Sequence, residues 1–302
     1  MKRRILVSIF SAVCFLTAVI IMLYPAISNY VNQKYASEIH TAYVEQLRQT
    51  DGSELRLIRD LANAYNLSIV PGATESDGYT QAAILAASED YEAQLNPTGD
   101  GTMGYIEIPK INVNLPIFHG TDTDTLDRGV GHLLGSSLPV GGSSTHTILT
   151  GHSGMASQKM FTDLARLSFE DVFYIHVLND TLAYQVDEIN TVLPHDTTYL
   201  QITPGEDYCT LVTCAPVGIN THRLLVRGHR IPYEEAKEVQ EEKEITIEET
   251  GSDWEDQYRL GLILGLFVML LFVLAILLRK LFLKYGWNKL YSKGGRYLCE
   301  KD

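Results

Sequence analysis

The chain contains none of the common sequence motifs for metal binding. It has no His-x-His, His-Glu-x-x-His or paired Cys-x-x-Cys spacing, and these are arrangements that typically hold zinc. The Gly-x-Ser-x-Gly motif is missing as well, which excludes the serine nucleophile elbow. The sequence therefore predicts no metal and no cofactor.

Basic residues are scarce in the middle of the chain. The formal net charge is −13, and lysine and arginine concentrate at the two ends, in Lys2 to Arg4 and from Arg279 to Lys301. A strongly acidic central domain repels phosphate groups. We therefore exclude nucleic acid as a partner.

Cysteine is also rare, with four in 302 residues. Cys14 lies in an apolar run and Cys299 in the C-terminal tail, so only Cys209 and Cys214 belong to the central domain. These two lie on one predicted strand at an odd offset, which directs their side chains to opposite faces and prevents a bridge. We expect no disulfide framework, a buried Cys209 and a free thiol at Cys214.

Two long runs carry no charge, Ile5 to Tyr24 and Leu260 to Leu278. Each is long enough to cross about 30 Å of hydrocarbon as a helix. Basic residues flank the outer end of each run, so the positive-inside rule places both termini in the cytoplasm and the intervening chain outside a cell membrane. A cleaved signal peptide is the alternative for the first run, but its apolar core exceeds the roughly 7–15 residues typical of one.

These features divide the chain into six segments. Residues 1–30 form a basic flank and a transmembrane helix, 31–100 a helical extension with a lid, 101–231 the main domain, 232–258 an acidic tether, 259–279 a second transmembrane helix and 280–302 a basic cytoplasmic tail. Apolar spacing predicts helices over Asn32–Arg48, Ser53–Asn66 and Thr80–Leu95. Because Glu dominates the tether, we expect it to be extended and solvated, with a charged surface helix as the alternative.

The main domain has the pattern of a β-protein, with short strands and closely spaced turns. The expected strands are Tyr105–Ile108, Val113–Ile117, Thr147–Leu149, Val172–Val177, Thr181–Val186, Asn190–Leu193, Tyr208–Cys214 and Arg223–Gly228. Leu178-Asn179-Asp180 is a hairpin turn between two of them. Short helices are expected over Asp122–Gly129 and Gln158–Ala165. About eight strands indicate a single β-barrel or sandwich.

The strand that ends at Cys214 is a candidate active-site strand. Pro216 closes its apolar pattern, so Cys214 sits at the mouth of the strand beside a turn. The following run can pair with it as a hairpin and bring Arg223 close to the thiol. A free cysteine thiol has a pKa of about 8.5 and needs a neighbouring cation or base to become a nucleophile.

His152 is the candidate base among nine histidines. It lies in Thr150-Gly151-His152-Ser153-Gly154, directly after an apolar strand, and glycines let the backbone approach closely while the ring projects. His119 and His132 lie in similar glycine-adjacent loops and stay open as alternatives. Arg223 presents a permanent charge and a fork of donors, suited to a thioester oxyanion.

These residues resemble the sortases, the cysteine transpeptidases of Gram-positive cell surfaces. The resemblance rests on Thr150-Gly151-His152, on Thr210-Leu211-Val212-Thr213-Cys214 and on Arg223 within Asn220-Thr221-His222-Arg223-Leu224. It extends from Gly104-Tyr105-Ile106 through Gly228-His229-Arg230. The implied fold is mainly β: an eight-stranded sortase-type barrel with an N-terminal helical extension and lid and two flanking transmembrane helices.

The resemblance also implies a mechanism. Cys214 is the nucleophile that attacks the Thr carbonyl of an LPxTG-like sorting signal, between Thr and Gly. His152 is the general acid and base that protonates the departing Gly amine, and Arg223 steadies the substrate carbonyl. The family's thiolate and imidazolium titrate as a pair.

The helical extension and the second span resemble class C, the pilin-polymerising sortases. Leu138-Pro139-Val140-Gly141-Gly142 and Val226-Arg227-Gly228-His229-Arg230 are similar to that class too. The implied partners are pilin or surface proteins with LPxTG-like signals, and the acceptor is a pilin Lys amine. Class C enzymes carry an Asp-Pro-aromatic lid, and the nearest match here is Ser76-Asp77-Gly78-Tyr79. Asp77 and Tyr79 are therefore lid candidates, although Gly replaces Pro and an ordinary turn is the alternative.

Three kinds of function remain open at this level. The first is pilus polymerisation, and the second is the anchoring of surface proteins or finished pili to a peptidoglycan precursor. The third is a hydrolytic cysteine protease or a catalytically idle binding barrel. The intact Cys214, His152 and Arg223 disfavour only the idle barrel, and the protease differs from the transpeptidase in its acceptor.

Overall fold

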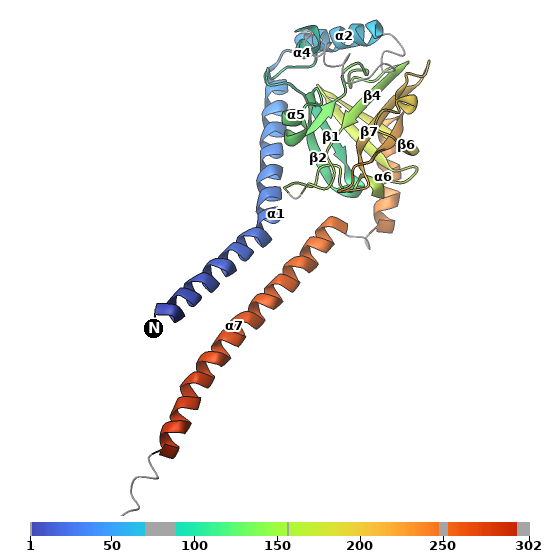
Figure 1. Ribbon diagram of the computed structural model, residues 1–302. Helices are drawn as coiled ribbons and strands as arrows, with labels where there is room; N and C mark the ends of the chain where they lie inside the picture. The colour runs from blue at the N-terminus through green and yellow to red at the C-terminus, as the bar shows by residue number, and fades with distance from the viewer. Residues whose placement is uncertain (1, 70–88, 156, 248–252, 295–302) are drawn as a thin grey trace, which may run out of the picture. The chain divides into compact units, whose positions relative to one another are not determined.

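A computed structural model describes residues 2–69, 89–155, 157–247 and 253–294 (Figure 1). The chain forms two compact units, one of Met1–Met22 with Asp253–Asp302 and one of Leu23–Ser252. The second unit contains the β-domain with His152, Cys214 and Arg223.

The β-domain is a closed barrel with the strand order β1-β2-β3-β4-β7-β8-β6-β5, which confirms the expected fold. The strands are β1 Thr102–Ile108, β2 Val113–His119, β3 Val130–His132, β4 Thr145–Thr150, β5 Val172–Val177, β6 Asp180–Val192, β7 Asp207–Ala215 and β8 His222–Ile231. Only the β2–β3 and β4–β7 pairs are parallel. The other neighbours pair antiparallel.

The alternation of side chains along the strands sorts them between the barrel interior and an outer layer. Leu149 and Leu211 are fully buried in the main core, whereas their neighbours Ile148 and Val212 belong to a separate outer cluster. Burying one such aliphatic side chain stabilises the fold by about 1.5–3 kcal/mol. A register slip of one residue would exchange the two layers, so this pattern fixes the β4–β7 register.

Two expected strand assignments were wrong. Thr181–Val186 and Asn190–Leu193 are parts of the single strand β6, whose pairing with β8 shifts register between Val186 and Glu188. A bulge of this kind interrupts the apolar alternation without ending the strand. The short strand β3 was missed because three residues with a central glycine resemble a turn.

The connections match the sequence expectations in part. Val177 pairs with Asp180, which confirms a hairpin through Leu178 and Asn179. The expected helix at Asp122–Gly129 is α5, Thr123–Arg128. The segment Gln158–Ala165 is not an α-helix, and its only helical residues belong to the 3-10 turn η2, Leu164–Arg166.

Where the structure describes it, the N-terminal extension contains α1 Lys2–Gln49, α2 Gly52–Ser68 and α4 Glu89–Ala93. The expected helix Asn32–Arg48 is therefore the last part of one long helix. Tyr43 of α1 joins two barrel segments, because its hydroxyl donates to Met103 O at 2.9 Å and accepts from Leu178 N at 2.8 Å. Figure 1 shows α2 and α4 above the barrel.

The acidic segment after the barrel is a helix, α6, Tyr233–Ile247. Over these residues the extended tether was wrong and the alternative, a charged surface helix, is confirmed. Ala236 of α6 is fully buried against the outer face of β5 and β6, and Val239 packs beside it. Lys243 pairs with buried Asp171 at 2.9 Å. A few apolar positions were enough to dock this helix on the barrel.

The unit of residues 1–22 and 253–302 is helical where it is described, with α7 spanning Asp253–Gly294. Both apolar runs are long and apolar enough to cross a membrane, with no residue of either 18-residue window buried inside the protein. They fit a membrane-anchored protein.

Candidate active site

Three neighbouring strands bring the candidate catalytic residues to the same level of the barrel. β4 and β7 pair in parallel, with Thr145 opposite Asp207 and Thr150 opposite Val212. Continuing this register by two residues places His152 opposite Cys214. On the other side of β7, Cys214 lies directly opposite Arg223 of β8. Neighbouring strands are about 4.8 Å apart, so the three residues form a row.

Hydrogen bonds extend the contact between β4 and β7 beyond the end of β4. Gly151 N donates to Val212 O at 3.0 Å, and the Thr213 hydroxyl donates to Gly151 O at 2.6 Å. The Ser153 hydroxyl then donates to Cys214 O at 2.6 Å. The residues on both sides of His152 are therefore bonded to the strand that carries the thiol.

The glycines of this loop are required by close packing. A Cβ on Gly151 would lie 2.7 Å from the ring of buried Phe161. Gly154 has a φ of +71°, and a Cβ there would lie 2.6 Å from Val217 Cγ1. The loop thus lies tightly between Phe161 and the β7–β8 turn, which holds the imidazole-bearing residue in place.

The His152 side chain is partly open to solvent and faces a carboxylate. Its Nε2 lies 3.6 Å from Asp127 Oδ1, and the two side chains are 31% and 52% exposed. Cys214 is half-buried, with no disulfide partner. This arrangement leaves both groups accessible to a substrate while their backbones are fixed.

The guanidinium of Arg223 is not neutralised by a carboxylate of the described chain. Its Nη1 donates to His222 O at 3.1 Å and to Asn220 O at 3.4 Å, and among the described residues no carboxylate forms an ion pair with it. Arg227, four residues along β8, instead pairs with Asp187 at 3.0 Å and with Glu188. Within the described chain, carboxylates therefore pair with the charge of Arg227 and leave that of Arg223 unpaired.

The alternative histidines are occupied by structural contacts. His119 makes ring contacts with Gly101 O at 3.0 Å and Gln94 O at 2.7 Å. His132 is fully buried, and burial lowers its pKa to about 4. Its Nε2 donates to Ser137 O at 2.9 Å while Nδ1 accepts from the Tyr91 hydroxyl at 2.9 Å. Neither ring is free to serve as a base.

Cys209 is confirmed as a buried hydrophobe with no exposed surface. Burial, with a smaller contribution from the Asp207 charge, raises the pKa of its thiol well above the ordinary value. It is therefore an inert thiol, unlike the half-buried Cys214.

Two further residues that sequence reasoning did not single out contact the candidate catalytic residues. Ser153 fixes the Cys214 carbonyl, and it was visible only as part of the His152 turn. Asp127 lies on α5, and nothing in the sequence linked it to His152. The lid candidates Asp77 and Tyr79 lie outside the described residues.

Comparison with known proteins gives one consistent family. The family model described as the sortase domain matches residues 106–231 of this chain. The structure is similar to sortase C1 from Streptococcus agalactiae, with a TM-score of 0.58 and 44% identity over 65% of this chain and 98% of that one. It is similar to sortase C from Streptococcus pneumoniae, with a TM-score of 0.58 and 43% identity over 65% of this chain and 97% of that one. A curated relative, sortase D of Bacillus subtilis (strain 168), is 29% identical over 143 residues, which are 46% of this chain and 69% of that protein.

Proposed function

Because the chain belongs to the sortase family of cysteine transpeptidases, we propose that it is a membrane-anchored enzyme that polymerises pilins. The sortase C structures in the comparison match this chain over nearly their whole length, and the Streptococcus pneumoniae enzyme is described as giving insights into pilin substrate specificity. The substrates are proteins with an LPxTG-like C-terminal sorting signal. The spans anchor the enzyme with both termini in the cytoplasm and the barrel outside.

The observation that carries the mechanism is the pairing of β4 with β7 and of β7 with β8. It puts Cys214 opposite Arg223 and aligns it with His152, two residues past the end of β4. The Cys214 thiolate attacks the Thr carbonyl of the sorting signal and forms a C–S bond. The Thr–Gly amide bond breaks, and the leaving Gly amine takes a proton from the His152 imidazolium. Arg223 stabilises the oxyanion through charge-assisted hydrogen bonds.

The thioester is then resolved by an amine. A Lys amine of the next pilin attacks the carbonyl carbon, an isopeptide C–N bond forms and the C–S bond breaks. The amine loses its proton to the neutral His152, and the Cys214 sulfur leaves as a thiolate. The imidazolium and thiolate are thereby regenerated, and no cofactor takes part.

The test uses the full chain in detergent with a sorting-signal peptide and a purified pilin domain that offers a Lys. An isopeptide product detected by mass spectrometry supports polymerisation. Transfer to a peptidoglycan precursor in place of the pilin would assign the chain to anchoring. Hydrolysis as the sole outcome would make it a protease.

A further inference from the structure

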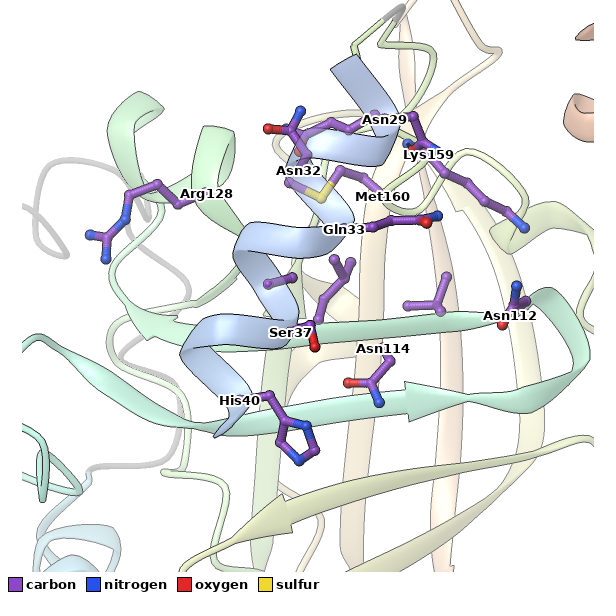
Figure 2. A pocket seen from close by; sticks show the side chains of 14 residues that line it. Asn29, Asn32, Gln33, Ser37, His40, Asn112, Asn114, Arg128, Lys159 and Met160 are labelled. Carbon is purple, nitrogen blue, oxygen red and sulfur yellow. Dashed lines mark hydrogen bonds between the residues drawn. The ribbon is translucent and has the colours of Figure 1, made fainter. Parts of the chain in front are cut away.

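A cavity of about 250 Å³ lies between α1 and the barrel, lined by side chains from α1, from the start of β2 and from the 158–160 loop. Amide side chains dominate the lining: Asn29, Asn32, Gln33, Asn112, Asn114 and Gln158. Figure 2 shows Asn29 and Lys159 at one end of the cavity and His40 with Asn114 at the other. Neither Cys214 nor Arg223 lines it.

Contacts on both sides of the cavity attach α1 to the barrel, so the cavity is a fixed part of the fold. At one end Lys159 N donates to Asn29 Oδ1 at 3.3 Å, and Asn32 Nδ2 donates to Ser157 O at 3.2 Å. Beyond the other end Tyr43 is bonded to the barrel, and the His40 ring packs against Tyr105 with centroids 4.1 Å apart. Between these points α1 bridges over the start of β2.

One wall of the cavity is an open strand edge. Four consecutive residues, Asn112 to Leu115, line the cavity. Successive side chains of a strand point to opposite faces, so a cavity on one face would be lined by every second residue. The cavity therefore meets β2 at its edge. β2 pairs with β3 only at Ile117, Phe118 and His119. In the described chain no strand therefore covers this edge from Val113 to Pro116.

The register shows which backbone groups face the cavity. Pro116 lies opposite Tyr105, and since proline has no N–H, this pair cannot exchange two hydrogen bonds. Hydrogen-bonded and non-bonded pairs alternate in an antiparallel ladder. Asn114, opposite Glu107, is then also in a non-bonded pair and directs its N–H and C=O away from β1, toward the open edge.

Several polar groups around the cavity lack partners within the described chain. The exposed side chains of Gln33, Asn112 and Asn114 form no hydrogen bond with the described chain, and His40 Nε2 is buried without a partner there. Burial, with a smaller contribution from His176, lowers the pKa of His40. Arg128 is positioned over the Phe118 ring at 4.3 Å and has no ion pair with any described residue.

The cavity is connected to the candidate active site through a short chain of contacts. Gln158 in its wall donates to Asp127 O at 2.9 Å, and Asp127 Oδ1 lies 3.6 Å from His152 Nε2. A ligand in the cavity would therefore reach the candidate active site from the side on which His152 lies. The donor peptide must instead contact Cys214 and Arg223 on β7 and β8.

We propose that this cavity docks an extended segment of the acceptor protein, an inference that rests on the proposed function. The segment pairs with the open edge at Asn114, as in strand addition to a sheet edge. The side chains of Gln33 and Asn112 bind its remaining backbone groups, and Arg128 binds an acidic side chain. The attacking Lys is thereby delivered next to His152, which takes its proton.

The test fills the cavity from an exposed position of α1 in the full chain. Ser37→Trp places an indole in the cavity, and Asn114→Ala removes one amide. Lys34→Trp on the same helix is the matched control, because Lys34 is exposed and does not line the cavity. Each variant forms the thioester with a sorting-signal peptide, which is then resolved either by the pilin domain or by hydroxylamine, a nucleophile too small to need docking.

We expect Ser37→Trp to lower kcat/KM for the pilin domain at least tenfold and Asn114→Ala to lower it about threefold. Release by hydroxylamine stays within twofold of wild type in every variant, and Lys34→Trp is unchanged with both nucleophiles. Pilin transfer by Ser37→Trp at the wild-type rate would overturn the docking site. If the wild-type enzyme reacts with hydroxylamine but never with a pilin domain, the proposed function fails, and the docking site fails with it.

Discussion

The substitution Gly151→Ala is predicted to damage the site through a single methyl group. The added Cβ would lie 2.7, 2.9 and 3.1 Å from three atoms of the Phe161 ring, whereas carbon atoms normally approach to about 3.5–4.0 Å. Either the loop or the ring must therefore shift by about 1 Å. Phe161 N donates to His152 O at 2.9 Å, so movement of either partner displaces His152.

The magnitude follows from two effects. Overpacking a buried site costs about 1–3 kcal/mol of the free energy of unfolding, and a displacement of about 1 Å at a catalytic group lowers a rate by up to about 100-fold. We expect Gly151→Ala to slow thioester formation about 10- to 100-fold. The double variant Gly151→Ala, Phe161→Leu should recover part of that rate, because the smaller side chain makes room.

The assay is single-turnover thioester formation with a sorting-signal peptide, quenched and read by mass spectrometry, beside urea unfolding of the same protein. Gly52→Ala is the control, since its Cβ would meet only the flexible end of Arg56 at 3.9 Å. Thioester formation by Gly151→Ala within twofold of the wild-type rate would show that the contact with Phe161 does not position the imidazole.

Three further predictions concern the site, the lid and the core. Ser153→Ala should slow thioester formation about 2- to 10-fold, as expected for a lost hydrogen bond of ~0.5–1.5 kcal/mol, and an unchanged rate would remove Ser153 from the site. Asp77→Ala or Tyr79→Ala should raise the rate at which a thiol reagent labels the nucleophile, whereas unchanged labelling would exclude a lid. Burial lowers the pKa of His132 and of His146 from 6.5 to about 4, so the unfolded chain takes up protons below pH 6.5 that the folded chain does not. This contribution to stability is present above pH 6.5 and is lost as the pH falls toward 4, so the free energy of unfolding should fall by about 1.5 kcal/mol per histidine between pH 6.5 and 5. Urea unfolding of His146→Gln at both pH values should show a smaller fall, and an equal fall would contradict the assignment.

The parts of the site that follow from local pattern could be predicted from sequence. The alternation of side chains along one strand predicted that Cys209 and Cys214 face opposite sides of it. The expected hairpin with the next strand placed Arg223 beside the Cys214 thiol. His152 was harder, because a parallel pairing between segments some sixty residues apart leaves no local signal. Its glycine-flanked turn and the family resemblance singled it out, and the β4–β7 register supplies the geometry.

The errors have a common physical origin in tertiary contacts. A bulge at Val186–Glu188 hid the continuity of β6. The acidic segment Tyr233–Ile247 is helical because Ala236 and Val239 find an apolar surface on β5 and β6. The cavity under α1 depends on a short β3 that leaves the edge of β2 open. Each of these features depends on contacts between distant segments, so the sequence of one segment does not predict it.

The proposed reaction depends on the sulfur of Cys214 as the attacking atom. The most direct measurement is to incubate the full chain with a sorting-signal peptide, quench in acid and locate the covalent adduct by peptide mapping. We predict an acyl adduct on Cys214 and none in Cys214→Ala. An adduct that persists in Cys214→Ala, or one that maps to another residue of the wild-type chain, would show that Cys214 is not the nucleophile.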